Sequence, residues 1–225
     1  MHSPQIDRSR QRPHPARMTE LPALIAAFTT LFIIIDPPGL APLYIALTQG
    51  MSPAQRRAIG LRACLTAMVL MLGFLFLGAS LLGFIGISMP AFRIAGGILL
   101  FITAHDMLFE RRQSRRKSNA DDSNDPGHDP SVFPLAIPLI VGPGAITTII
   151  LLAGRATGPA DYAAITAVMA LNMVIVFGFF IASTTIERIL GKTGINVVTR
   201  VLGMLLAALA VQFILVGLRS SGLAT

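Results

Sequence analysis

Charged side chains along this sequence are gathered into short islands, and the segments between the islands are strongly apolar. An α-helix needs about 20 predominantly apolar residues to cross the hydrocarbon core of a bilayer. Six segments are close to that length or exceed it, the first of them interrupted by Asp36: residues 21–49, 63–86, 94–109, 132–154, 162–186 and 201–218. This pattern predicts an all-α membrane protein with six transmembrane helices.

The composition agrees with a chain whose solvent is lipid. Hydrophobic residues make up 53% of the sequence and charged residues 13%, and the mean hydropathy is +0.70. Soluble domains carry about 25% charged residues. The single cysteine, Cys64, excludes a disulfide framework and a CxxC redox motif, so we expect it to pack in the second span.

The basic residues predict the orientation of the spans, because Lys and Arg accumulate on the cytoplasmic side of membrane proteins. Few basic residues lie at the second connection, the fourth connection and the C-terminal end: Arg93, Arg155 and Arg219. The first, third and fifth connections have many more: Arg56, Arg57, Arg62, Arg111, Arg112, Arg115, Arg116, Lys117, Arg188, Lys192 and Arg200. We therefore expect both termini outside the cytoplasm. The net charge of +7 then reflects span orientation, and we expect no binding of nucleic acid.

Residues 1–17 form a polar tail that disagrees with this orientation, since its four arginines would lie on the translocated side. One explanation is that the tail is the n-region of a signal peptide, although no convincing small-residue cleavage site follows it. The other, which we favour, is that translation starts at Met18, so that the tail is not in the native product.

Residues 111–131 are polar throughout and without periodicity, which is typical of a flexible cytoplasmic loop. The loop separates a first unit, residues 18–110, from a second unit, residues 132–225. Its acidic end does not follow the order of an EF-hand, because Pro126 precedes the glycine and the bidentate glutamate is missing. We therefore expect a solvated linker and no calcium site.

The first and fourth spans are each interrupted in the middle by helix-breaking residues. Asp36, Pro37, Pro38 and Gly39 lie inside the first, and Pro138 with Gly142, Pro143 and Gly144 lies inside the fourth. Proline removes a backbone donor, and inside a membrane the freed backbone groups need a protein partner or a water-filled cavity. A plain kink would explain one break; two breaks at matching positions favour a functional use of the backbone.

The two units also correspond in sequence. Gly144 follows Gly39 by 105 positions, and Arg200, which opens the sixth span, follows Arg93, which opens the third, by 107. Because three spans per unit is an odd number, the two units must have opposite orientations. The sequence therefore predicts two inverted three-helix repeats with helices 1 and 4 broken at the Pro/Gly motifs, the plan of secondary transporters.

The candidate substrate-binding residues follow from the breaks. The amides of the half-helices after Gly39 and Gly144 suit a substrate carboxylate, and carbonyls freed at the breaks suit an ammonium group. Asp36 has two candidate roles, as a ligand for substrate or a coupling cation and as the cap of the half-helix that follows it. Thr147 and Asn172 add polar groups, whose alternatives are bonding to their own helix and joining two helices.

Other chemistry is not indicated by this sequence. It contains no HExxH, GxSxG or GxxxxGK[ST] motif, and its four histidines are scattered. We expect no catalytic residues, metal site or cofactor. His105 and Asp106, near the end of the third span, are interpreted as members of an interfacial ion cluster.

At these residues the sequence resembles the MarC family, also called the neutral amino acid transporter family, of bacterial and archaeal inner-membrane proteins. The resemblance rests on TLFIIIDPPGLAPLYIALT (30–48), FRIAGGILLF (92–101), FPLAIPLIVGPGAITTII (133–150) and RVLGMLLAALAVQFILVGL (200–218). It implies six transmembrane helices in inverted repeats, a bacterial inner-membrane location and, for members with an assigned function, small neutral amino acids as substrates. Members often carry Asn where this sequence has Asp36.

Together these observations predict a secondary transporter of small neutral amino acids such as glycine or alanine, working by alternating access with both termini periplasmic. Coupling to H⁺ or Na⁺ and homo-oligomer formation are left open. The rivals are an exporter of another small polar solute and a non-transporting scaffold or regulatory protein. A lipid-modifying enzyme would need a cluster of acidic or histidine residues at one interface, which this sequence lacks.

Overall fold

The computed structural model describes residues 18–111 and 129–222, and all regular structure in them is helical. In chain order the elements are α1 (Leu21–Ile35), α2 (Pro37–Leu47), α3 (Pro53–Ile85), α4 (Met89–Leu108), the irregular helical segment η1 (Ser131–Ile140), α6 (Pro143–Ala153) and α7 (Pro159–Ser220). The all-α expectation is thereby confirmed. The tail 1–17 and most of the expected loop 111–131 lie outside the described residues.

Several of these helices have the length and composition of membrane spans. In the described ranges four qualify, α1 with α2 counted as one, and a fifth is obtained when η1 and α6, which meet at a bend of 63°, are joined. Only 22% of the most apolar window of α3 is buried inside the protein. Large apolar side chains such as Val69, Phe84 and Val174 are exposed, which suits contact with lipid tails. The protein is therefore an integral membrane protein.

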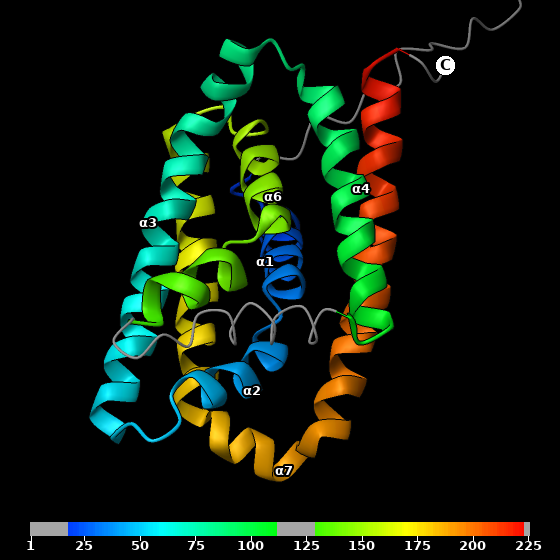
Figure 1. Ribbon diagram of the computed structural model, residues 1–225. Helices are drawn as coiled ribbons and strands as arrows, with labels where there is room; N and C mark the ends of the chain where they lie inside the picture. The colour runs from blue at the N-terminus through cyan, green and yellow to red at the C-terminus, as the bar shows by residue number, and fades with distance from the viewer. Residues whose placement is uncertain (1–17, 112–128, 223–225) are drawn as a thin grey trace, which may run out of the picture.

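α7 is sharply bent at Gly191. A straight helix of its 62 residues would be about 93 Å long, roughly three times the hydrocarbon thickness of a bilayer. Gly191 has φ 60° and ψ 180°, a conformation open essentially to glycine alone. The helical arms 159–190 and 192–220 rise from this bend on opposite sides of the molecule (Figure 1).

The bounds of some spans differ from the sequence prediction. α3 begins at Pro53, ten residues before the expected 63, because a helix that leaves the membrane can continue with charged side chains in water. Its first turn is closed by a capping box between Ser52 and Gln55. The expected spans 162–186 and 201–218 are joined through helical backbone and the Gly191 bend.

α4 and the second arm of α7 approach each other closely along their length. A Cβ at Gly97 would lie 2.9 Å from the Ala210 carbonyl oxygen, and a Cβ at Gly217 would lie 3.2 Å from the Pro90 carbonyl oxygen. Small residues permit such backbone contact between membrane helices. This pair forms one wall of the molecule (Figure 1).

α1 and α6 occupy the centre of the molecule. In Figure 1 they lie between α3 with the first arm of α7 on one side and α4 with the second arm on the other. The span containing α1 has 61% of its most apolar window buried, against 22% for α3. The span formed by α1 and α2 is therefore the most enclosed of the four single spans, and most residues of α6 are buried as well.

Candidate functional site

The first break is a single residue, Asp36, between α1 and α2. Asp36 ends α1 in the left-handed conformation (φ 58°, ψ 63°) and is the N-cap of α2, which continues with Pro37 and Pro38. Its buried Oδ1 accepts a hydrogen bond from the Gly39 N–H at 3.2 Å. Aspartate tolerates this conformation because its short polar side chain bonds locally. The capping role expected from the sequence is thus present.

Gly39 is required by the position of this carboxylate. A Cβ at Gly39 would overlap the Asp36 side chain, which lies directly over it. Any other residue at position 39 would therefore displace the carboxylate from the first turn of α2. Glycine here sets the place of a charged group.

Thr199, on the second arm of α7, makes a further contact with Asp36. Its Oγ1 donates to Asp36 Oδ1 at 3.3 Å, and the residue is 3% exposed. This contact ties the first broken span to a segment 163 positions later in the chain. Sequence reasoning missed Thr199, because a lone threonine before Arg200 carries no signal beyond its place near a repeat marker.

The second break has no side-chain cap. Gly142 is the N-cap of α6 (φ −87°, ψ 176°), Pro143 follows it, and no side chain in the described chain accepts from the first amides of α6. A Cβ at Gly142 would lie 3.0 Å from the Pro138 carbonyl oxygen, so glycine permits the tight turn out of η1. The break leaves N-terminal amides of α6 in the buried centre of the protein.

The structure brings the two breaks together. A Cβ at Gly144 would lie 3.2 Å from Ile34 Cγ2, two residues before Asp36, and 3.0 Å from Leu100 Cδ2 on α4. One turn later, the Thr147 methyl packs directly on Gly96 of α4. The candidate residues from Asp36 to Gly39 and from Gly142 to Thr147 therefore lie around one central region where α1, α4 and α6 meet.

Two further buried polar side chains have an unsatisfied atom. Within the described ranges, Thr148 Oγ1 and Asn172 Oδ1 have no hydrogen-bond partner. Asn172 Nδ2 donates to the Val168 carbonyl in its own helix at 2.9 Å. In the described residues, Asn172 forms no hydrogen bond to another helix and none to the two breaks. Its oxygen is therefore available to a ligand or water.

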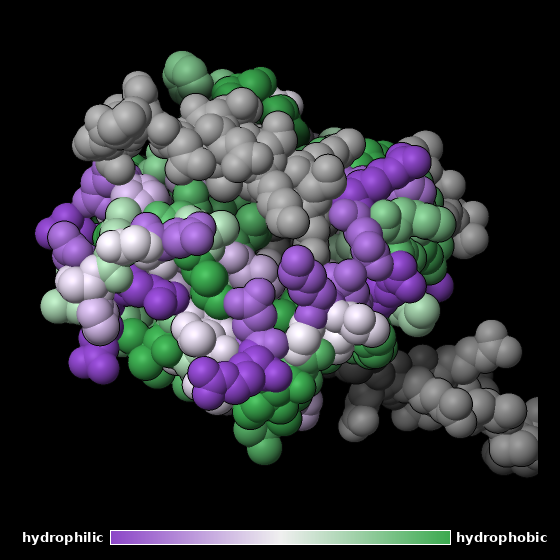
Figure 2. Space-filling view, turned by 60° about the horizontal axis from the view of Figure 1, so that its bottom comes forward, coloured by the Kyte–Doolittle hydropathy of each residue, from purple (hydrophilic) through white to green (hydrophobic). Residues whose placement is uncertain are grey.

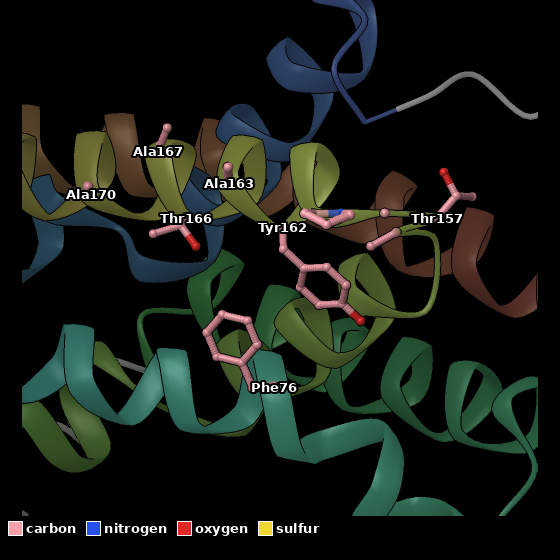
Figure 3. Close-up of a pocket in the computed structure, with 10 residues that line it drawn as sticks. Phe76, Thr157, Tyr162, Ala163, Thr166, Ala167 and Ala170 are labelled. Atoms are coloured by element: carbon pink, nitrogen blue, oxygen red, sulfur yellow. The ribbon is translucent and has the colours of Figure 1, made fainter.

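A large pocket lies away from the two breaks. It has a volume of about 950 Å³ and is lined by Phe76 of α3, the turn before α7 and small residues of the first α7 arm such as Ala163 and Ala167 (Figure 3). The stacked rings of Phe76 and Tyr162, 5.6 Å apart, form part of its wall. Its apolar lining and exposed edges suit lipid rather than a polar solute, and the residues of the breaks do not line it.

Hydrophilic side chains spread over the end of the molecule that is lowest in Figure 1 (Figure 2). Arg62 pairs with Asp129 at 2.8 Å, and Arg200 pairs with Glu110 at 2.6 Å. Burial acts to raise the pKa of Asp129, but hydrogen bonds from Ser131 and the Arg62 guanidinium outweigh it, so this pKa lies below its ordinary value. We call this end, defined by Arg56, Arg57 and these residues, the basic face.

Comparison with known proteins gives a consistent result. The profile of the MarC family integral membrane proteins matches residues 21–221. A UPF0056 membrane protein of Archaeoglobus fulgidus is 41% identical over 193 residues, covering 86% of this chain and 91% of that protein. The UPF0056 membrane proteins YvbG of Bacillus subtilis and YhcE of Escherichia coli are 34% and 33% identical, covering 87% and 89% of this chain and 94% of each relative. No solved structure matches the chain.

Proposed function

This chain belongs to the MarC family of integral membrane proteins, and we propose that it is a secondary transporter of small neutral amino acids working by alternating access in the bacterial inner membrane. The observation that carries the proposal is the meeting of two broken helices at the protein centre, where Gly144 packs against Ile34 beside Asp36. Broken helices that meet inside a membrane are how secondary transporters present backbone groups to a solute.

The proposed architecture is six transmembrane helices in two inverted repeats. The first repeat comprises α1 with α2, α3 and α4; the second comprises η1 with α6 and the two arms of α7. It is supported by the bend at Gly191 and by the equivalent places of the breaks, each followed by a proline at the start of a half-helix. In a repeat of three spans, the second copy is inverted relative to the first.

In this proposal the substrate is held largely by backbone groups. The first amides of α6 bind its carboxylate, aided by the positive end of the helix dipole. Its ammonium group faces the Asp36 carboxylate. The close packing of Gly144 and Thr147 against α1 and α4 supports a small substrate. Asp36 is also the group through which H⁺ or Na⁺ would couple.

The proposed orientation places the basic face in the cytoplasm and both termini in the periplasm, as the positive-inside rule requires. Cys64 is the single cysteine of the sequence, so a Cys64→Ala background permits single-cysteine labelling. A Ser220→Cys thiol should react with an impermeant maleimide in intact spheroplasts, and a Gln55→Cys thiol only after lysis. The reverse pattern would contradict this orientation.

The function is tested by uptake of labelled glycine and alanine into proteoliposomes, with and without proton and sodium gradients. Gly39→Leu and Gly144→Leu should each abolish gradient-driven uptake, because both side chains would enter occupied space. Gly178→Leu is the matched control, since a Cβ there meets nothing within 4 Å. Absence of uptake by well-folded wild-type protein would favour another solute or a non-transporting role.

A further inference from the structure

A second, smaller pocket lies at the basic face, where the end of α2, the start of α3 and the first arm of α7 come together. Its volume is about 170 Å³, and its lining includes Tyr44, Phe180, Arg56, Arg57 and Thr184. It is separate from the proposed transport site, since none of the residues of the two breaks line it. Its chemistry combines an aromatic floor with two cations.

The floor of this pocket is a stacked aromatic pair. The rings of Tyr44 and Phe180 are 4.4 Å apart and inclined by 9°, and both residues are 1% exposed. They approach α3 closely because position 60 is glycine: a Cβ at Gly60 would lie 3.3 Å from Tyr44 Oη. Tyr44 Oη donates to the Arg56 carbonyl at 2.6 Å, which fixes the start of α3 against α2.

The Arg56 guanidinium is held over this floor by neutral groups. Its Cζ lies 5.6 Å from the centre of the Tyr44 ring, and its Nη2 donates to Ser183 Oγ at 3.4 Å. A cation over an aromatic face keeps its full charge while its position is fixed. Arg56 is therefore a positioned positive charge at the mouth of a pocket.

The charges of Arg56 and Arg57 have no carboxylate partner in the part of the chain that the structure describes. Among residues 18–111 and 129–222, no carboxylate lies within 4.0 Å of either guanidinium, whereas Arg62 and Arg200 on the same face each have a carboxylate partner, at 2.8 Å and 2.6 Å. At the start of α3, the Gln55 amide already donates to Ser52 Oγ, and the Ser52 amide donates to Gln55 Oε1. The two arginines are thus the groups at this pocket that an anion would complement.

We propose that this pocket binds the phosphate headgroup of an anionic phospholipid of the cytoplasmic leaflet. A fork of guanidinium donors matches phosphate oxygens, and basic pockets between membrane helices on the cytoplasmic side are suited to such headgroups. A lipid is favoured over free phosphate because Ile181 at the pocket edge is 45% exposed and Leu61 on α3 is 48% exposed. These side chains continue the lipid-facing surface along which acyl chains would lie. The bound lipid would join α2, α3 and α7.

The test is binding of phosphatidylglycerol to the full-length protein in detergent. Native mass spectrometry measures retention of the lipid, and thermal unfolding measures stabilisation by it. Wild type should retain phosphatidylglycerol but not phosphatidylcholine and should be stabilised by it. Arg56→Gln with Arg57→Gln should weaken phosphatidylglycerol binding by about thirtyfold, as expected for two interfacial basic residues. Arg57→Gln alone should weaken it by about fivefold. The Arg57 side chain is exposed and bonds to no group in the described chain. The single variant therefore tests the proposal even if the double variant does not fold.

The matched control is Arg111→Gln with Lys192→Gln, which removes the same charge from exposed positions outside the pocket. It should leave phosphatidylglycerol binding within about twofold of wild type, because charge effects fall off within a Debye length. An equal loss in the control and pocket variants would overturn the proposal in favour of a diffuse charge effect. Equal stabilisation by inorganic phosphate would overturn it in favour of a site for a free anion.

Discussion

The two breaks in the central helices are built in opposite ways. The first is polar: the Asp36 carboxylate caps α2 through the Gly39 amide and receives the Thr199 hydroxyl. The second is steric: Gly142 supplies no cap, and α6 is positioned by the close fit of Gly144 against its neighbours. The charge at the first break already accepts hydrogen bonds, whereas the amide donors at the second break have no side-chain acceptor in the described residues. Apart from Gly39, where any side chain would displace the carboxylate, substitutions should therefore act through chemistry at the first break and through size at the second.

The largest effect is expected from size at the second break. Gly144→Leu should abolish amino acid uptake and lower the free energy of unfolding by about 3 kcal/mol, because the side chain would collide with Ile34 and Leu100. Gly178→Leu should leave uptake unchanged and should change the free energy of unfolding by no more than about 0.5 kcal/mol. Uptake and thermal unfolding in detergent measure both quantities. Unchanged behaviour of Gly144→Leu would show that the fit at the second break is not what positions α6.

Removing the cap should have the next largest effect. Asp36→Ala should cost about 1–2 kcal/mol of stability through loss of the cap on α2. Asp36→Asn keeps a side-chain acceptor and should lose less than half of that, which separates capping from charge. If Asp36→Asn is as unstable as Asp36→Ala, the charge and not the cap holds the first break. Comparing uptake by Asp36→Asn with and without a proton gradient then reports on coupling.

A smaller effect is expected at Thr199. Thr199→Val is nearly isosteric and removes one hydrogen bond to Asp36, so it should cost about 1 kcal/mol of stability. Thr199→Ser keeps the hydroxyl and serves as the control for bonding. If Thr199→Val matches wild type in stability and in KM for uptake while Thr199→Ser is impaired, the methyl group and not the hydrogen bond is what matters here.

The smallest effect concerns Asp129, an exposed counterpart of Asp36 at the start of η1. Its Oδ1 accepts from the Ser131 N–H at 3.0 Å, and its pKa lies below the ordinary value of about 3.9. A depressed native pKa contributes stability above the unfolded-state pKa, and this contribution is lost as pH falls below about 4 and through the native pKa. Asp129→Asn should flatten this part of the stability profile against pH. An unchanged profile would show that Asp129 bonds equally well when protonated.

The sequence predicted the breaks because proline and glycine act locally: Pro37 and Pro143 each begin a half-helix at the place expected from backbone chemistry alone. The bend at Gly191 was missed, since Gly191 lies among charged residues expected to form a loop. The contacts of Asp36 with Thr199 and of Gly144 with Ile34 depend on how distant helices pack. No periodicity or composition encodes such tertiary partners. A lone carboxylate in an apolar span, in contrast, can be identified from the sequence as a candidate functional residue.

The central claim is that the meeting of the two breaks is an amino acid site, and protection of a cysteine there tests it most directly. In a Cys64→Ala background, Thr147→Cys places a thiol one turn beyond Gly144, and Ser220→Cys provides an exposed reference. Glycine and alanine should slow modification of the thiol at position 147 by a small maleimide and leave that at position 220 unchanged. Equal rates with and without these amino acids, in folded protein that retains uptake, would contradict the account.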